Sequence, residues 1–280
     1  MAQPGSAHAW GAWGRRFKSC HPDYFKIIQI KMGINIFSND DQANGNFNNG
    51  EILEKKPIGF SQDGGKLKPY SNLFYWAHAW TPNKKSTIGL HPHQGFEICS
   101  FILKGNINHF DTKLNKWISL SEGDVQIIRS RNGISHSEEI DNKSEIFQIW
   151  FDPDISESLK KKASYSDYKS SEFKRIESKN KNTKIIVGQD SPIKMDSQGI
   201  LINEYEFQIG KHNLGIKKKS IHSIFILKGK IKLKSVLLTK GTFLKIENLD
   251  FLNFQVIQNS KVFEIISPLN PSYRTYSQNN

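Results

Sequence analysis

Two short motifs in this chain carry residue types that bind metals. His91 and His93 stand two residues apart, and so do His136 and Glu138. Side chains alternate between the two faces of a β-strand, so each pair points to one side if its segment is a strand. Imidazole nitrogens and a carboxylate suit a divalent transition metal. We therefore expect these four side chains to hold one ion inside a β-barrel, with one or two coordination positions left for a substrate or oxygen.

Two further residues share the odd-numbered positions of the first motif. Glu97 could be a fifth ligand, or it could orient an imidazole from outside the ligand set. Cys99 is interpreted as a small core residue. A single His-x-His pair is more often an exposed or hydrogen-bonded pair than a ligand pair. Two such motifs, each beside a glycine turn in a β context, favour the metal site.

The segments around these motifs are typical of strands. Between residues 70 and 151, runs of branched and aromatic residues alternate with glycine turns, and no long stretch has a period of 3.6. The sequence FILKG occurs at residues 101–105 and again at residues 225–229. This internal repeat indicates a duplicated β domain. We expect an all-β chain made of two tandem, jelly-roll-like β-barrels.

The pattern also predicts domain boundaries. We expect a leader or arm at 1–31, a metal-binding barrel at 32–155, a polar linker at 156–182 and a second barrel at 183–275. Aligning the two FILKG segments puts Gly215, Lys217 and Ile221 opposite His91, His93 and Glu97. The second barrel is therefore expected to lack metal ligands and to serve a structural role, or to cover one side of the first site.

Composition excludes several classes of protein. The formal charge is +12, but it comes from scattered lysines, so sequence-specific nucleic-acid binding is not expected. The chain has 2 cysteines, which do not form a disulfide framework. No apolar run is long enough to span a membrane, and the pair Arg15-Arg16 is not followed by the apolar stretch of an export signal. We expect a cytoplasmic protein.

The residues around the two motifs resemble the pirin family of cupins. HPHQGFE at 91–97 with the following LKG resembles its first cupin motif, and SEGDVQ at 121–126 with NGISHSE at 132–138 resembles its second. The resemblance implies a bicupin fold and iron held by His91, His93, His136 and Glu138. The segment before Gly133 departs from the family pattern because it contains Arg129 and Arg131. We expect these two arginines at the mouth of the site, where they would affect the substrate.

The resemblance also implies three alternatives for function. The leading one is a quercetinase-type flavonol 2,4-dioxygenase that uses O2 to open flavonol-like enolic phenols with release of carbon monoxide, with Glu138 as the catalytic base. The second is an iron-dependent, redox-sensing regulator of a protein partner, such as a transcription factor or an enzyme, without turnover. The third is a metal-binding barrel without activity. Fe(II) is the expected metal, and Ni, Mn, Cu and Zn fit the same ligands.

Overall fold

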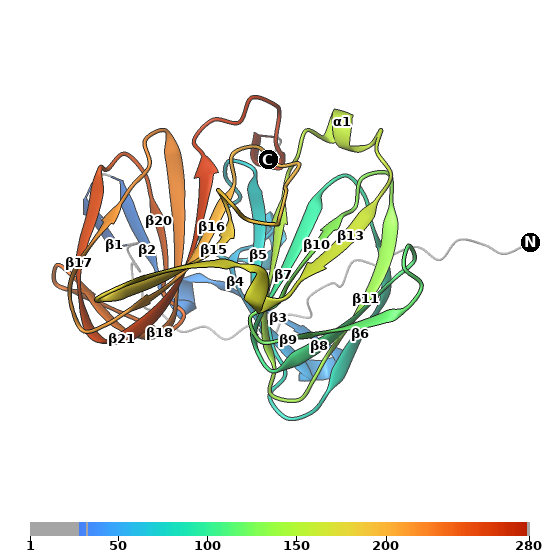
Figure 1. Ribbon diagram of the computed structural model, residues 1–280, viewed down its shortest axis with the longest axis horizontal. Helices are drawn as coiled ribbons and strands as arrows, with labels where there is room; N and C mark the ends of the chain where they lie inside the picture. Colours follow the sequence, from blue (N-terminus) through green and yellow to red (C-terminus); the bar gives the residue numbers. More distant parts are fainter. Residues whose placement is uncertain (1–27, 32, 279–280) are drawn as a thin grey trace, which may run out of the picture.

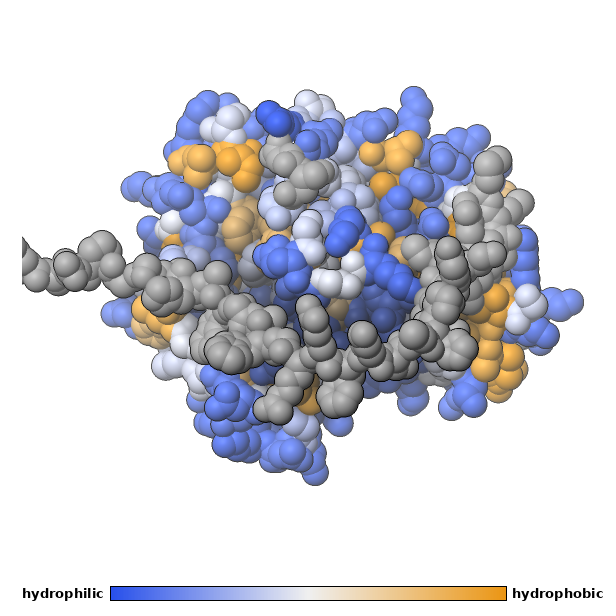
Figure 2. Space-filling view, turned by 180° about the vertical axis from the view of Figure 1, so that it is seen from behind, coloured by the Kyte–Doolittle hydropathy of each residue, from blue (hydrophilic) through white to orange (hydrophobic). Residues whose placement is uncertain are grey.

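Two β-barrels stand side by side in a computed structural model, which describes residues 28–31 and 33–278 of the chain (Figure 1). The expected all-β bicupin architecture is confirmed. Within the described residues, no helix is long and apolar enough to cross a membrane. The face seen in Figure 2 is mainly hydrophilic where it is not grey, with separate apolar patches between the polar groups.

The first barrel consists of two sheets. The larger sheet has seven strands in the order β13-β10-β7-β12-β5-β4-β3, and the smaller has the order β6-β11-β8-β9. The strands of the larger sheet are β3 (Ala43–Phe47), β4 (Ile52–Ile58), β5 (Leu73–Trp80), β7 (Glu97–Lys104), β10 (Val125–Arg129), β12 (Glu145–Phe151) and β13 (Ser164–Tyr168). Those of the smaller sheet are β6 (Ser86–His93), β8 (Asn106–Asp111), β9 (Trp117–Ser121) and β11 (Ile134–Ile140).

The second barrel is one curved sheet of ten strands. Its main path is β1-β2-β20-β18-β21-β16-β15-β14, with β17 paired to β21 and β19 paired to β18. The strands are β1 (Ile28–Lys31), β2 (Ile34–Phe37), β14 (Lys174–Ser178), β15 (Lys181–Val187), β16 (Leu201–Phe207), β17 (Gly210–Gly215), β18 (Ser220–Leu233), β19 (Val236–Thr239), β20 (Phe243–Ile246) and β21 (Phe251–Pro268).

Helical structure in the described residues is limited to single turns. The α-helical turn is α1 (Ile155–Ser158), and Asp154 caps it by accepting a hydrogen bond from the backbone nitrogen of Ser156. The 3-10 turns are η1 (Asn39–Asp41), η2 (Asn48–Gly50), η3 (Ser61–Asp63), η4 (Ser170–Glu172) and η5 (Tyr276–Gln278).

The two barrels share one aromatic core. The outer faces of β5, β7 and β12 pack against those of β18, β20 and β21, and the largest hydrophobic cluster spans both barrels. The indole of Trp76 in the first barrel lies 5.2 Å from the ring of Phe243 and 5.7 Å from that of Phe263 in the second. Burial of such large rings is a strongly favourable contribution to the contact between the barrels.

The FILKG repeat lies at the centre of this shared core. Phe101 of the first copy packs on Phe263, with ring centroids 4.9 Å apart. Phe225 of the second copy packs on Phe147 at the same distance of 4.9 Å. Each repeated phenylalanine also has a phenylalanine opposite it on the neighbouring strand of its own barrel. Phe101 lies opposite Phe147, and Phe225 lies opposite Phe263. The repeat therefore marks equivalent strands that face each other across an approximate twofold relation.

The strand pairing divides the chain differently from the expected boundaries. Strand β2 falls in the range expected for the first barrel, but it pairs with β20 of the second. In the expected linker, β13 extends the first barrel beside β10, and β14 extends the second beside β15. Of the expected leader, residues 28–31 form β1, and residues 1–27 lie outside the described residues. Pairing between segments far apart in the chain causes these differences, and the domain boundaries themselves stay a prediction.

Shortening the chain tests the place of β2. A chain that starts at Met32 lacks residues 1–31, of which the described part is the edge strand β1, and it is expected to fold and to bind metal. A chain that starts at Ser38 also loses Ile34, Ile36 and Phe37, which are 3–5% exposed. Each such side chain contributes about 1.5–3 kcal/mol on burial, so thermal melting should show a large loss of stability. Equal melting temperatures for the two chains would contradict this role of β2.

The C-terminal segment returns across the first barrel and contacts Asp152. The hydroxyl of Tyr273 donates to the backbone oxygen of Asp152 at 2.7 Å, and the backbone nitrogen of Tyr276 donates to its carboxylate at 2.6 Å. Burial raises the pKa of the Asp152 carboxyl to about 6, although the hydrogen bond from Tyr276 opposes this shift. The tail is therefore held in part by a carboxyl group that resists ionisation.

Asp152→Asn should change the pH dependence of stability. Between the unfolded pKa of 3.8 and the folded pKa of about 6, the folded protein keeps a proton that the unfolded chain has lost. The wild type therefore loses stability as pH rises through this window. Asparagine cannot ionise, so the variant should gain on the order of 2 kcal/mol relative to the wild type at pH 8 and little at pH 4. Denaturant unfolding at both pH values measures this, and an equal difference at both would refute it.

Candidate metal centre

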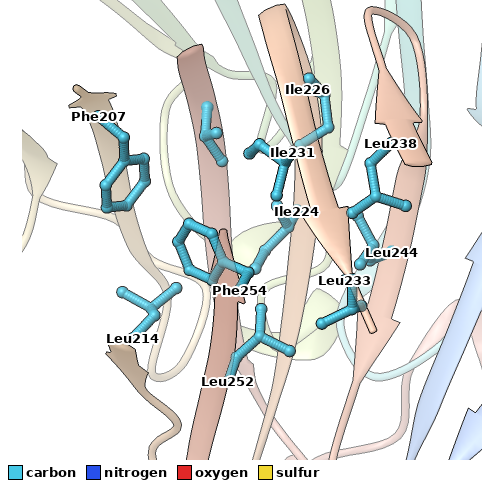
Figure 3. Close-up of a pocket in the computed structure, with 11 residues that line it drawn as sticks. Phe207, Leu214, Ile224, Ile226, Ile231, Leu233, Leu238, Leu244, Leu252 and Phe254 are labelled. Carbon is cyan, nitrogen blue, oxygen red and sulfur yellow. The ribbon is translucent and has the colours of Figure 1, made fainter. Parts of the chain in front are cut away.

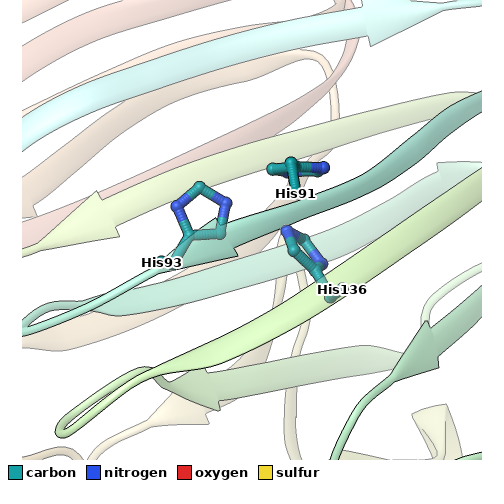
Figure 4. A group of neighbouring side chains, drawn as sticks. All are labelled: His91, His93 and His136. Atoms are coloured by element: carbon teal, nitrogen blue, oxygen red, sulfur yellow. The ribbon is translucent and has the colours of Figure 1, made fainter. Parts of the chain in front are cut away.

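The candidate ligands lie on two adjacent strands of the smaller sheet. Strands β6 and β11 pair antiparallel, with His91 directly opposite His136 and His93 opposite Ile134. The register shifts between His136 and Glu138, where a bulge in β6 adds one residue. Period-two alternation then brings the three imidazoles to one point, as Figure 4 shows. The ring centroids of His91 and His136 are 4.4 Å apart, and that of His93 lies 4.8 Å from His91 and 4.9 Å from His136.

The nitrogen atoms of these imidazoles are poorly satisfied by protein groups. The Nδ1 of His91 lies 2.7 Å from the backbone oxygen of Gly89, so it donates and leaves Nε2 with a free lone pair. Among the described residues, the buried Nε2 of His93 and both buried ring nitrogens of His136 lack a hydrogen-bond partner. Buried polar atoms without partners are rare, and a coordinated ion would account for these. The donor set therefore fits a divalent metal.

Burial keeps the imidazoles of His93 and His136 neutral. It lowers the pKa of His93 to about 3, with a further lowering by the charges that His136 and His91 would carry. It lowers the pKa of His136 to about 2, again with a contribution from His91. Metal ligation needs the unprotonated ring, so the folded protein supplies these rings in the required form at neutral pH without a metal present.

The carboxylate of Glu138 lies fully buried beside the imidazoles. Its Oε1 accepts hydrogen bonds from Gln126 Nε2 at 2.8 Å and from Ser100 Oγ at 3.1 Å. Its Oε2 accepts one from Gln148 Nε2 at 2.6 Å, and the Trp150 indole donates in turn to Gln148 at 3.2 Å. These donors come from β7, β10 and β12 of the larger sheet. They fix the orientation of the carboxylate and leave Oε2 with room for one more partner.

The potential ligands form two overlapping groups. The ligand atoms of His91, His93 and His136 all lie within 4.8 Å of one another. A second group with the same spread consists of His109, His136 and Glu138. His136 belongs to both groups. The structure thus brings the three predicted histidines together. Glu138 lies close to one of them, His136, as does His109, a histidine that the motifs did not include.

Glu97 lies on the opposite face of the larger sheet and away from the imidazoles. Its carboxylate accepts hydrogen bonds from the backbone nitrogens of Asp196 and Ser197, both at 2.8 Å. Burial raises the pKa of this carboxyl, and the hydrogen bonds from Ser197 and Asp196 partly offset the rise. The turn between β6 and β7 breaks the alternation that the odd-number count assumed. Glu97 therefore joins the first barrel to the second half of the chain. Cys99, on the same face of β7, is buried in the hydrophobic cluster that both barrels share.

The two arginines expected at the site mouth also reach toward the second half of the chain. Arg129 donates to the backbone oxygen of Lys194, and its Nε lies 3.6 Å from a Glu97 carboxylate oxygen. Arg131 forms an ion pair with Asp196, at 2.9 Å from Nε and 2.8 Å from Nη2. The backbone of Arg131 accepts from Gly95 close to the site, but its guanidinium group is turned away. This placement differs from the expected one, because both side chains have buried or half-buried acceptors there.

A pocket opens at the surface beside His93. It is lined by Pro92, His93, Gln94, Thr112, Gly133, Ile134 and Ser135. On its inner side, the ring of His93 lies 5.2 Å from Trp150 and 5.4 Å from Phe96. Phe96 and Trp150 stack on each other with centroids 4.9 Å apart. The surroundings of His93 therefore combine polar pocket residues on one side with flat aromatic rings on the other.

The interior of the second barrel has a different character. Its pocket is lined by aliphatic and phenylalanine side chains that point inward from several strands (Figure 3). Deeper in the same barrel, the His222 and Glu264 side chains form a buried pair, with Nδ1 2.7 Å from the carboxylate. Both groups of three potential ligands found in the described residues belong to the first barrel. The expectation that the second barrel binds no metal stays a prediction.

His109 is the site residue that the sequence motifs missed. It is fully buried, and it lies directly across from Glu138 on the neighbouring strand β8. A signal was present, because His109 and Asp111 repeat the spacing of His136 and Glu138.

Comparison with known proteins gives matches in sequence. A model of the Pirin family matches residues 57–151, which include the four predicted ligands. Pirin-1 of Arabidopsis thaliana is 33% identical over 108 residues, 37% of this chain and 36% of that protein. The quercetin 2,3-dioxygenase of Escherichia coli is 36% identical over 70 residues, 24% of this chain and 30% of that protein. The chain thus spans about a third of the length of these two relatives.

Comparison of folds extends over most of the chain. The bacterial pirin YhhW of Escherichia coli, solved in complex with nickel(II), superposes with a TM-score of 0.67 over 84% of this chain and 99% of YhhW. The two sequences are 18% identical in that alignment, so this likeness bears on the fold alone. Residues 57–151 therefore match the Pirin family in sequence, and the chain has the fold of a bacterial pirin.

Proposed function

We propose that this protein is a divalent-metal-dependent dioxygenase that acts on flavonol-like enolic phenols, with His91, His93, His136 and Glu138 as the metal ligands. The observation that carries the proposal is the convergence of buried, unpartnered imidazole nitrogens beside an oriented, buried carboxylate. The relative from Escherichia coli that is named quercetin 2,3-dioxygenase supports the reaction type. The nickel(II) complex of YhhW, a protein of the same fold, supports a divalent ion in this protein.

The ligand set leaves the identity of the metal open among several ions. Neutral imidazoles and one carboxylate accept Fe(II), Ni, Mn, Cu or Zn. Fe(II) is the ion that we propose, because redox chemistry with O2 requires a metal that can exchange an electron with the substrate or the oxygen. When bound, such a metal supplies the Lewis acidity and the electron transfer that the reaction of a phenolate with O2 needs.

The residues around the site would bind the substrate and move its proton. A planar phenol entering beside His93 would stack near Phe96 and Trp150, whose flat faces suit an aromatic ring. Glu138 would accept the proton of the enolic hydroxyl at Oε2, the oxygen that has only Gln148 as a donor. Gln148, held by Trp150, keeps this oxygen aimed into the site. The buried position of Glu138 excludes water from the proton transfer.

A second candidate function has its own supporting observation. The smaller sheet exposes two large apolar side chains: Leu90 on β6 is 59% exposed, and Trp117 on β9 is 51% exposed, with its ring 5.6 Å from that of Phe110. Exposed apolar side chains on the sheet that holds the histidines fit a regulator whose protein partner reads the oxidation state of iron. Binding of a protein that changes when the iron is oxidised would favour this alternative.

The metal site can be tested by stoichiometry and by one ligand substitution. We expect one divalent ion per chain by elemental analysis. His91→Ala should weaken Ni(II) binding by about 100-fold or more in competition with a chelator, since even an outer partner of a metal ligand contributes 10–100-fold. His78→Ala, which removes a buried histidine elsewhere in the same barrel, should leave the affinity unchanged. Two ions per chain, one of them kept after all four ligands are replaced, would refute the site.

The role of Glu138 as a base can be tested separately. Glu138→Gln keeps the size of the side chain and one coordinating oxygen, but it cannot accept the proton. Oxygen uptake with a panel of flavonols should fall about 10²–10⁴-fold in the metal-loaded variant. The matched control is Glu139→Gln, because the neighbouring Glu139 points away from the site and pairs with Lys85 at 3.1 Å. Full activity of metal-loaded Glu138→Gln would exclude the base role, and no uptake by the iron-loaded wild type would favour the regulatory alternative.

A further inference from the structure

The segment that follows the last strand of the second barrel lies on the first barrel, at the end of β12. The hydroxyl of Tyr273 donates to the backbone oxygen of Asp152 at 2.7 Å and accepts from Asn72 Nδ2 at 3.2 Å. Three residues later, the backbone nitrogen of Tyr276 donates to the Asp152 carboxylate at 2.6 Å. The 3-10 turn η5 therefore lies beside β5 (Figure 1), and the segment is fixed two residues beyond Trp150.

The ring of Tyr276 belongs to an aromatic cluster that reaches the candidate metal centre. Its centroid lies 5.2 Å from that of Phe74 and 5.9 Å from that of Phe60. Both of these rings contact the indole of Trp150, Phe74 at 6.0 Å and Phe60 at 5.9 Å. The indole in turn lies 5.2 Å from the ring of His93. Tyr276 and His93 therefore lie at opposite ends of one continuous set of packed rings.

Trp150 connects this cluster to the carboxylate of the site. Its indole nitrogen donates to Gln148 Oε1 at 3.2 Å, and Gln148 Nε2 donates to Glu138 Oε2 at 2.6 Å. Hydrogen bonds weaken steeply when they bend, so the first bond depends on the position of the indole plane. Phe60 and Phe74 both meet that plane edge to face, at interplanar angles of 61° and 65°. Aromatic pairs prefer this geometry, so the surrounding rings set the orientation of the indole.

We propose that Tyr276 is a positioning residue of the site in the first barrel, and that it holds Trp150 in the orientation that keeps its bond to Gln148. The inference rests on the proposed function, because an effect on turnover would pass through Glu138. The three histidines lie on β6 and β11 of the smaller sheet, away from this cluster of the larger sheet. The loss of the Tyr276 ring should therefore disturb the proton acceptor and leave the imidazoles in place.

The first test observes Trp150 in the metal-free, full-length protein. A ¹H–¹⁵N spectrum resolves the indole N–H signals of its six tryptophans, and Trp150→Phe identifies the signal of Trp150. Tyr276→Ala should shift this signal and speed the exchange of its proton with solvent about 2–10-fold, because the bond to Gln148 is weakened. Tyr276→Phe keeps the ring and should leave the shift and the exchange rate unchanged.

The second test measures turnover and metal binding in the same variants. With a flavonol as substrate, kcat for oxygen uptake by metal-loaded Tyr276→Ala should fall about tenfold or more, because small displacements of a catalytic group are costly. Tyr276→Phe should restore kcat. The Ni(II) affinity of both variants, by competition with a chelator, should stay close to that of the wild type. A loss as large as that of His91→Ala would overturn the inference, because Tyr276 would then support the metal site as a whole.

The matched control is Tyr168→Ala. Tyr168 is also half-buried, and it lies in the same barrel on β13, where its ring contacts Phe173 at 6.4 Å. This variant should keep the Trp150 signal and kcat of the wild type. A change in the Trp150 signal as large as that of Tyr276→Ala would indicate a general loosening of the barrel and would overturn the specific role of Tyr276.

The outcomes separate this inference from the proposed function. If the wild type shows no oxygen uptake while the Trp150 signal responds to Tyr276→Ala and not to Tyr276→Phe, the proposed activity is wrong and the positioning of Trp150 stands. If folded Tyr276→Ala keeps the wild-type signal and exchange rate, the inference is overturned, whatever the activity. Should Tyr276→Ala fail to fold, Tyr276→Leu, which keeps apolar bulk without a flat ring, decides by the same criteria.

Discussion

The alternation of side chains along β7, β10 and β12 is the constraint on which both the core and the candidate site depend. One face of these three strands buries apolar residues in the hydrophobic cluster shared with the second barrel. The other face presents polar side chains to Glu138. The apolar set is Phe101, Ile127 and Phe147, and the polar set is Ser100, Gln126 and Gln148. A slip of one residue in any of these strands would exchange the two sets. The register that builds the aromatic core therefore also positions the carboxylate.

This constraint makes the second barrel part of the support of the site. Strands that donate to Glu138 are held on their far side by ring contacts such as Phe147 with Phe225 at 4.9 Å. The same far side is tied down at one end by Glu97 and Arg129, which contact residues 194–197. A metal or proton-transfer site works only when its groups are held within about 0.5 Å of the productive geometry, and packing of the supporting residues provides this. The contact between barrels thus bears on the chemistry proposed for the first barrel.

Much of the fold and part of the site could be predicted from the sequence because they depend on local patterns. Period-two spacing identified His91, His93 and His136, and the FILKG repeat identified the duplicated domain. The rest depends on pairing between distant segments, which a single sequence does not reveal. The turn at 94–96 sends Glu97 to the opposite face from the imidazoles, and Asp196 draws Arg131 away from the site mouth. The pairing of β2 with β20 and the position of His109 opposite Glu138 have the same origin.

The two barrels use equivalent positions in opposite ways. Phe147 and Phe263 occupy corresponding places in the two sheets, so Gln148 of the first barrel corresponds to Glu264 of the second. In the second barrel, Glu264 bonds to His222 and to the hydroxyl of Tyr205, and the other nitrogen of His222 accepts from the backbone of Lys217 at 2.8 Å. That pair is satisfied by protein groups alone. In the first barrel, four buried imidazole nitrogens, on His93, His109 and His136, have no protein partner among the described residues. Because leaving each such nitrogen unsatisfied costs stability, the difference supports the proposal of a ligand in the first barrel.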